Sequence, residues 1–168
     1  MRKTLIWVLL IVTAAIVEAT WLGALRFQGV LPDLILLLVV YVAIVGTPER
    51  AMATGLLGGL FQDVAADSSL GHHVICLVIV GFVVGKLSRR LITDSPAVKV
   101  GLVFGAGLLH GIIYVTVSYV QNPDMNALHA IAVSVIPRSF YTALLTPIFY
   151  FMLNQASGFP HRFQRDTH

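Results

Sequence analysis

Long apolar runs separated by short polar breaks dominate this chain. Six such runs lie at about residues 4–25, 31–46, 51–66, 73–90, 98–120 and 127–153. Their apolar positions are continuous rather than alternating, which favours helices over the strands of a barrel. A helix that crosses ~30 Å of hydrocarbon needs roughly 17–25 residues, so the second and third runs are close to the lower limit. The pattern predicts six membrane-spanning helices.

Composition supports the same class of protein. Of the 168 residues, 57% are hydrophobic and 11% are charged, whereas soluble domains carry about a quarter charged residues. So few charges cannot cover a surface that faces water, and in lipid a helix pairs its own backbone polar groups. We therefore expect one all-α integral membrane domain over residues 1–168.

The first apolar run has two interpretations. Arg2 and Lys3 precede it, and Val17 and Ala19 are small residues of the kind found before a signal-peptide cleavage site. The run is nevertheless long enough to span a bilayer. We expect an uncleaved first helix.

The placement of the cations predicts the orientation. With six crossings, one side holds the following residues: Arg2, Lys3, Arg50, Lys86, Arg89, Arg90, Lys99, Arg162 and Arg165. The other side holds Arg26, and Arg138 is left inside a run. Because Lys and Arg are retained in the cytoplasm, both termini are expected there, together with a basic tail at residues 154–168. This predicts a multi-pass protein of the bacterial inner membrane.

Glycine spacing indicates close helix packing. Small residues four positions apart let helix backbones approach in lipid. The residues concerned are Gly55, Gly58, Gly59, Gly71, Gly81 and Gly85, with further pairs at Gly101/Gly105 and Gly107/Gly111. We interpret all of these glycines as packing inside the protein, with a face for a partner's helix as the alternative.

Four ionisable residues inside the runs form a candidate polar network: Glu18, Asp63, His110 and Arg138. Charges at membrane depth are costly and are usually paired. A long arginine side chain can reach several ångströms along the membrane normal, so Arg138 is expected to pair with Glu18 or Asp63. A structural ion pair is favoured over a proton or substrate site.

Other chemistry is disfavoured. His72 and His73 are adjacent on a helix and point about 100° apart, so with Asp63 and Asp67 they make a poor metal site. Ser68, Ser69 and His110 fit no nucleophile pattern, and Lys and Arg are not interleaved with aromatics as nucleic-acid binding requires. We expect no cofactor, no metal, no nucleic acid and no enzymatic activity; a lipid-handling enzyme lacks a catalytic cluster.

Two stretches resemble the rod shape-determining protein MreD family. One is the run LPDLILLLVVY at residues 31–41, and the other is GLLGGLFQD at residues 55–63, followed by SSLG at 68–71 and VGFVVG at 80–85. The chain length and six predicted spans also agree. The family usually carries a polar residue, often Asn, where Asp33 stands.

The resemblance implies a non-enzymatic subunit of the bacterial elongation machinery. Such proteins associate with MreC and act beside MreB, RodA and a class B penicillin-binding protein in lateral peptidoglycan synthesis. Their fold resembles that of the S components of energy-coupling-factor transporters. The expected function is therefore a membrane scaffold, possible as a homodimer and in contact with anionic lipid. The alternative is an S component that binds a vitamin-like solute.

Overall fold

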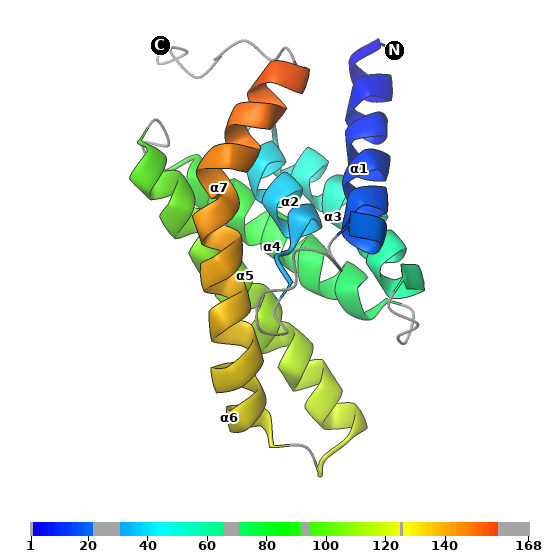
Figure 1. Ribbon diagram of the computed structural model, residues 1–168, viewed down its shortest axis with the longest axis vertical. Helices are drawn as coiled ribbons and strands as arrows, with labels where there is room; N and C mark the ends of the chain where they lie inside the picture. The colour runs from blue at the N-terminus through cyan, green and yellow to red at the C-terminus, as the bar shows by residue number, and fades with distance from the viewer. Residues whose placement is uncertain (1, 22–30, 66–70, 92–94, 125, 158–168) are drawn as a thin grey trace.

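The computed structural model describes residues 2–21, 31–65, 71–91, 95–124 and 126–157, and every regular element in these ranges is helical. The elements are α1 (Arg2–Trp21), α2 (Leu34–Val45), α3 (Pro48–Ala65), α4 (His72–Ser88), α5 (Pro96–Gln121), α6 (Ala127–Ala130), the π-helical turn η1 (Ile131–Val135) and α7 (Ile136–Ser157). The last three follow one another without a break, so the described residues form six helical segments, whose arrangement is shown in Figure 1.

These segments lie where the six apolar runs predict helices. Arg26, the polar turn at residues 67–69 and most of the predicted tail lie outside the described residues. Two segments are long and apolar enough to cross a membrane: Pro96–Gln121 with 26 residues and Ala127–Leu153 with 27. The other apolar stretches among the described residues are shorter, so six crossings stay a prediction.

Helix α2 is the centre of the molecule. Nine of its 12 residues are buried, on all sides of the helix, which is the pattern of a helix enclosed by protein. It contacts α1, α3, α4, α5 and α7. At about 1.5 Å per residue this 12-residue helix is only ~18 Å long. Its apolar residues are covered by the neighbouring helices.

Helices α3 and α4 pack backbone against backbone. A Cβ added at Gly55 would lie 2.5 Å from the carbonyl oxygen of Leu77, and one at Gly59 would lie 2.6 Å from Cα of Val74. Gly81 and Gly85 approach the start of α3 at Ala51 and Pro48 in the same way, and Gly58 meets Ile35 of α2. These five glycines lie inside the protein.

Gly71 has a different role. It precedes α4 with a φ of 98°, a left-handed conformation that glycine adopts without steric cost. A Cβ there would meet no atom within 4 Å. Gly71 is thus required by the turn and not by helix packing.

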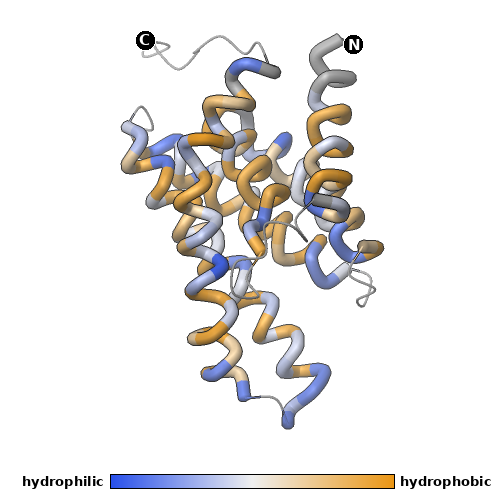
Figure 2. Tube along the Cα trace, viewed as in Figure 1, coloured by the Kyte–Doolittle hydropathy of each residue, from blue (hydrophilic) through white to orange (hydrophobic). Residues whose placement is uncertain are grey.

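The α5 and α6–α7 segments form a long hairpin that extends beyond the other four helices (Figure 1). Gly107 and Gly111 bring α5 against Ser139 and Val135. Pro137 has no N–H for a helical bond to Val133, and the π-helical turn η1 lies just before it. Figure 2 shows apolar residues along most helices and polar residues at the hairpin tip.

Candidate functional site

Polar side chains meet where α2 and α4 begin. Asp33 is the N-cap of α2, and its carboxylate accepts the N–H of Leu36 at 2.8 Å. Glu18 of α1 accepts the N–H of Ile35, also in the first turn of α2, at 3.0 Å. Both carboxylates therefore lie at the positive end of the α2 dipole.

Asp33 is the centre of this polar cluster. Only 1% exposed, it accepts a hydrogen bond from Nη2 of Arg138 on α7 at 3.1 Å. Nδ1 of His110 on α5 lies 3.8 Å from the same Oδ2. The backbone N–H of Asp33 donates to Oγ1 of Thr142 at 3.1 Å. Asp33 thus connects the start of α2 to α7 of the α5–α7 hairpin through two hydrogen bonds.

Gln62 of α3 joins the two carboxylates. Its Nε2 donates to Oε1 of Glu18 at 2.7 Å and to Oδ1 of Asp33 at 3.0 Å. A neutral amide between two acids supplies donors to both without adding charge. The polar cluster therefore consists of Glu18, Asp33, Gln62, His110 and Arg138.

Asp63 belongs to a separate group that closes the turn between α3 and α4. It accepts the N–H of Gly71 at 2.7 Å and that of His73 at 2.8 Å. Nδ1 of the His73 ring lies 2.9 Å from its Oδ1. The neighbouring His72 stacks on Tyr114 of α5, with ring centroids 4.2 Å apart. This group fixes α4 against α3 and α5.

The predicted partner of Arg138 was wrong. The hydrogen-bonded carboxylate is that of Asp33, not that of Glu18 or Asp63, because α7 passes the start of α2 and Asp63 is already engaged by α4. Of the four predicted network residues, Glu18, His110 and Arg138 gather around Asp33. Asp63 stands apart, and its partner His73 lies 6.0 Å from His110, between ring centroids.

Asp33 and Gln62 were missed as network members. Both could have been recognised as polar residues flanked by apolar runs. Asp33 is a favourable residue for the start of a helix, and its burial gives it a second role.

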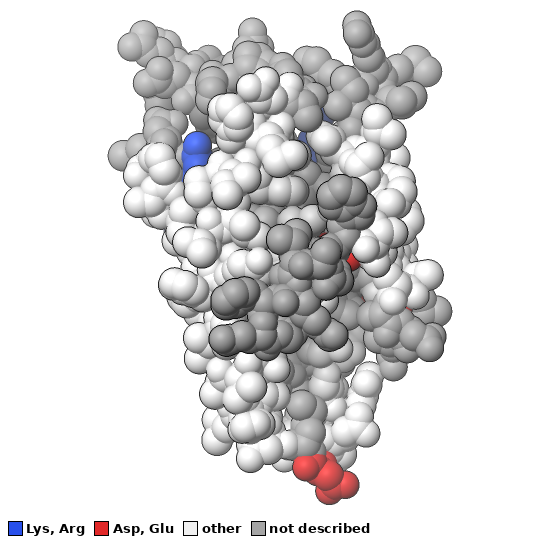
Figure 3. Space-filling view, viewed as in Figure 1, with Lys and Arg blue, Asp and Glu red and all other residues white. Residues whose placement is uncertain are grey.

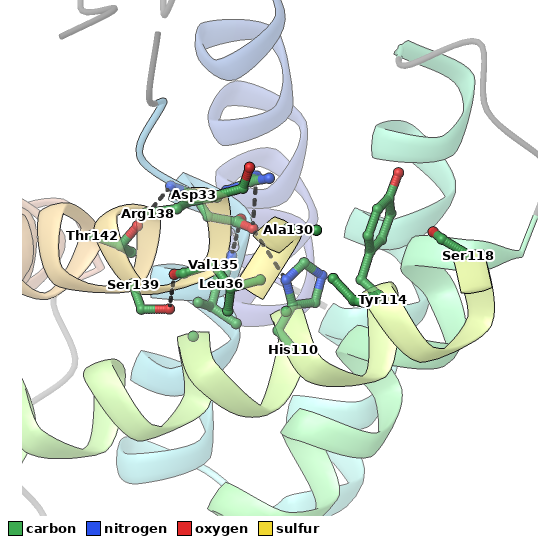
Figure 4. A pocket seen from close by; sticks show the side chains of 14 residues that line it. Asp33, Leu36, His110, Tyr114, Ser118, Ala130, Val135, Arg138, Ser139 and Thr142 are labelled. Carbon is green, nitrogen blue, oxygen red and sulfur yellow. Dashed lines mark hydrogen bonds and ion pairs between the residues drawn. The ribbon is translucent and has the colours of Figure 1, made fainter. Parts of the chain in front are cut away.

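A cavity of about 270 Å³ opens beside the polar cluster, between α5 and the α6–α7 segment. Asp33, His110 and Arg138 line one end of it, and Tyr114 and Ser118 lie farther along the hairpin (Figure 4). Ser134 also lines the cavity. Nε2 of His110 and Nε of Arg138 are buried and have no hydrogen-bond partner among the described residues. Buried polar atoms without partners are rare and costly, so this cavity is the candidate binding site.

The described residues contain no group of three or more His, Cys, Asp or Glu that could hold a metal ion. What the cavity offers is hydrogen bonding: a guanidinium, an imidazole and several hydroxyls. Such groups can bind and orient a polar ligand.

These observations define a helical membrane protein with a buried ion-pair cluster. The family described as rod shape-determining protein MreD matches residues 1–155, which is nearly the whole chain. The chain therefore belongs to the MreD family and has a role in determining rod shape. No curated protein and no solved structure gives a match, so the predicted likeness to S components rests on the family resemblance alone.

Proposed function

We propose that this protein is a non-enzymatic membrane scaffold of the elongation machinery whose direct partner is MreC. In this proposal it holds the transmembrane helix of MreC and so supports lateral peptidoglycan synthesis directed by MreB, RodA and a class B penicillin-binding protein. Membership of the MreD family supports the role in cell shape. The partner and the absence of catalysis are parts of the proposal.

One observation favours a helix as the docked element. Gly101 and Gly105 of α5 are exposed, and a Cβ added at either would meet nothing within 4 Å. They lie four residues apart on a segment long and apolar enough to span a membrane. Such a pair lets a second helix approach the backbone closely. The buried glycines of α3 and α4 have no surface left for that purpose.

Pull-down of the tagged protein from native membranes, followed by mass spectrometry, tests the proposal. We expect MreC and the peptidoglycan synthases with the parent protein, and recovery of MreC about tenfold lower with Gly101→Leu/Gly105→Leu, because the added side chains block close approach. Ala132→Leu, at another exposed small residue, is the control. Recovery of ATPase and coupling subunits instead would replace the scaffold with a transporter component.

The orientation in this proposal is six crossings with both termini in the cytoplasm. The start of α1 and the end of α7 lie at one end of the molecule (Figure 1). In Figure 3, blue atoms of Lys and Arg lie near that end, and red atoms of acidic residues cover the opposite tip. Positive charge near one end agrees with a cytoplasmic location of that end.

Cysteine labelling tests this orientation. Cys76 is the only cysteine and is buried, so Cys76→Ala gives a background without reactive thiols. In intact spheroplasts an impermeant maleimide is expected to label Asp124→Cys and to label Arg50→Cys only after lysis. The reverse pattern would invert the orientation, and labelling of both from one side would exclude an odd number of crossings between them.

A further inference from the structure

Around the cavity beside the polar cluster, the charged side chains have more unused hydrogen-bond donors than unused acceptors. Both oxygens of the Asp33 carboxylate are occupied: Oδ1 accepts from Leu36 and Gln62, and Oδ2 accepts from Arg138. Glu18 is likewise bound by Ile35 and Gln62. Three of the about four lone-pair sites of Asp33 are therefore used, and Glu18 does not line the cavity.

Donor capacity remains on the side that faces the cavity. A guanidinium carries five N–H donors in a planar fork, and the hydrogen bond from Nη2 of Arg138 to Asp33 uses one of them. Its Nε is buried without a partner among the described residues, the side chain as a whole is 39% exposed, and the residue lines the cavity. An arginine with unused donors can bind a group with several oxygens, such as a carboxylate or a phosphate, through two parallel hydrogen bonds.

His110 supplies a second point of contact. It is 96% buried, since its exposed fraction is 4%, and it lines the cavity with Nε2 unpartnered among the described residues. A neutral ring that carries its proton on Nε2 donates from that atom towards a ligand oxygen. Two donors from different helices would then meet one ligand group.

The ligand's surroundings follow from the position of the cavity. It lies between the two segments that are long and apolar enough to span a membrane. Outward-facing residues of the same hairpin are apolar and exposed, among them Ile112, Val133 and Ile136. Ser118 and Ser134 line the part of the cavity farther from Asp33, where their hydroxyls can bind ester oxygens.

We propose that this cavity binds a phosphate group, carried by a membrane lipid or by a soluble phosphate ester, with Arg138 and His110 as its main contacts. Arginine binds phosphate through parallel N–H···O bonds. The hydroxyls of Ser118 and Ser134 hold the esterified part. This binding is independent of the docking of MreC proposed above.

Native mass spectrometry of the full-length protein in mild detergent tests the proposal with three probes. They are dioleoyl phosphatidylglycerol, dioleoylglycerol with the same chains and no phosphate, and glycerol phosphate. Retention of the phospholipid and not of dioleoylglycerol supports a lipid source. Retention of glycerol phosphate, and displacement of the phospholipid by it, supports a soluble source. Equal retention of both lipids, or retention of neither phosphate compound, overturns the proposal.

Variants locate the bound phosphate. Arg138→Lys keeps the charge beside Asp33 but loses the planar fork, so we expect phosphate binding about tenfold weaker. Ser118→Leu and Ser134→Leu fill the cavity without touching the ion pair and are expected to abolish binding. Thr116→Leu is the matched control on α5, because Thr116 is exposed and does not line the cavity. Unchanged binding in both filled variants would place the phosphate elsewhere and overturn the assignment.

Discussion

Two helix pairs in this molecule are built in different ways. The α3–α4 pair is closed by glycines, with Gly55 and Gly59 of α3 against the backbone of α4. The α5–α7 pair is close at Gly107 and Gly111, but the same two segments also border a cavity with unpartnered polar atoms. Dense packing leaves no space for a ligand. The first pair is therefore structural, and the second contains the candidate binding site.

Of the variants that test the two helix pairs, the one that removes the ion pair should lower the free energy of unfolding most. Arg138→Met leaves the carboxylate of Asp33, 1% exposed, without its cation. Removing one partner of a buried pair costs about 3–5 kcal/mol. Because the Arg138 side chain is 39% exposed and partly screened, we expect the free energy of unfolding in detergent to fall by an amount towards the lower end of that range, measured by denaturant titration.

The double variant Asp33→Asn/Arg138→Met distinguishes the pair from the arginine side chain itself. Asparagine can still accept the N–H of Leu36 and needs no counter-charge. Stability should recover by roughly half or more of the loss, because no unpaired charge remains. An additive loss would mean that Arg138 stabilises through packing alone.

Asp63→Asn tests the turn of the glycine-closed pair. The amide replaces an acceptor oxygen by a donor, although Gly71 and His73 supply three donors to this carboxylate. Hydrogen bonds to a charged group are worth about 1.5–3 kcal/mol, and we expect a loss in that range. Hydrogen exchange at the start of α4 should accelerate, whereas exchange in α5 stays unchanged. Equal acceleration of hydrogen exchange in α4 and α5 would show that the turn does not open independently of the rest of the protein.

Gly55→Ala tests the packing of α3 against α4 directly. Its new Cβ would lie 2.5 Å from the oxygen of Leu77, so the two backbones must separate. Overpacking of this kind costs about 1–3 kcal/mol. Thermal unfolding in detergent should show a lower midpoint, and a midpoint equal to that of the parent would mean that the helices can move apart freely.

Gly105→Ala should have the smallest effect. The added methyl group meets nothing within 4 Å, and alanine favours a helix over glycine by up to ~1 kcal/mol. We expect the thermal midpoint to be equal to or slightly above that of the parent protein. A clear loss of stability would show that α5 packs on another copy of the chain through this face.

The hydrophobic pattern predicts the helices well because each is a local property of its own residues. The break at Asn122 and Pro123, for example, separates α5 from α6 in the structure as in the sequence. The pairing of Arg138 is not local, since it depends on the crossing of α7 over the start of α2. Glu18 and Arg138 lie in the first and the last apolar run of the sequence. The structure brings both to the first turn of α2, because that helix is short and central.

The bond between Asp33 and Arg138 joins residues 105 positions apart in the chain. During synthesis the acid therefore enters the membrane long before its cation has been made. Until the last helical segment arrives, the carboxylate of Asp33 has no guanidinium to neutralise it. Chains truncated before Arg138 should be recognised as incomplete and degraded, although five of the six helical segments are present. The ion pair can thus form only after translation has passed residue 138.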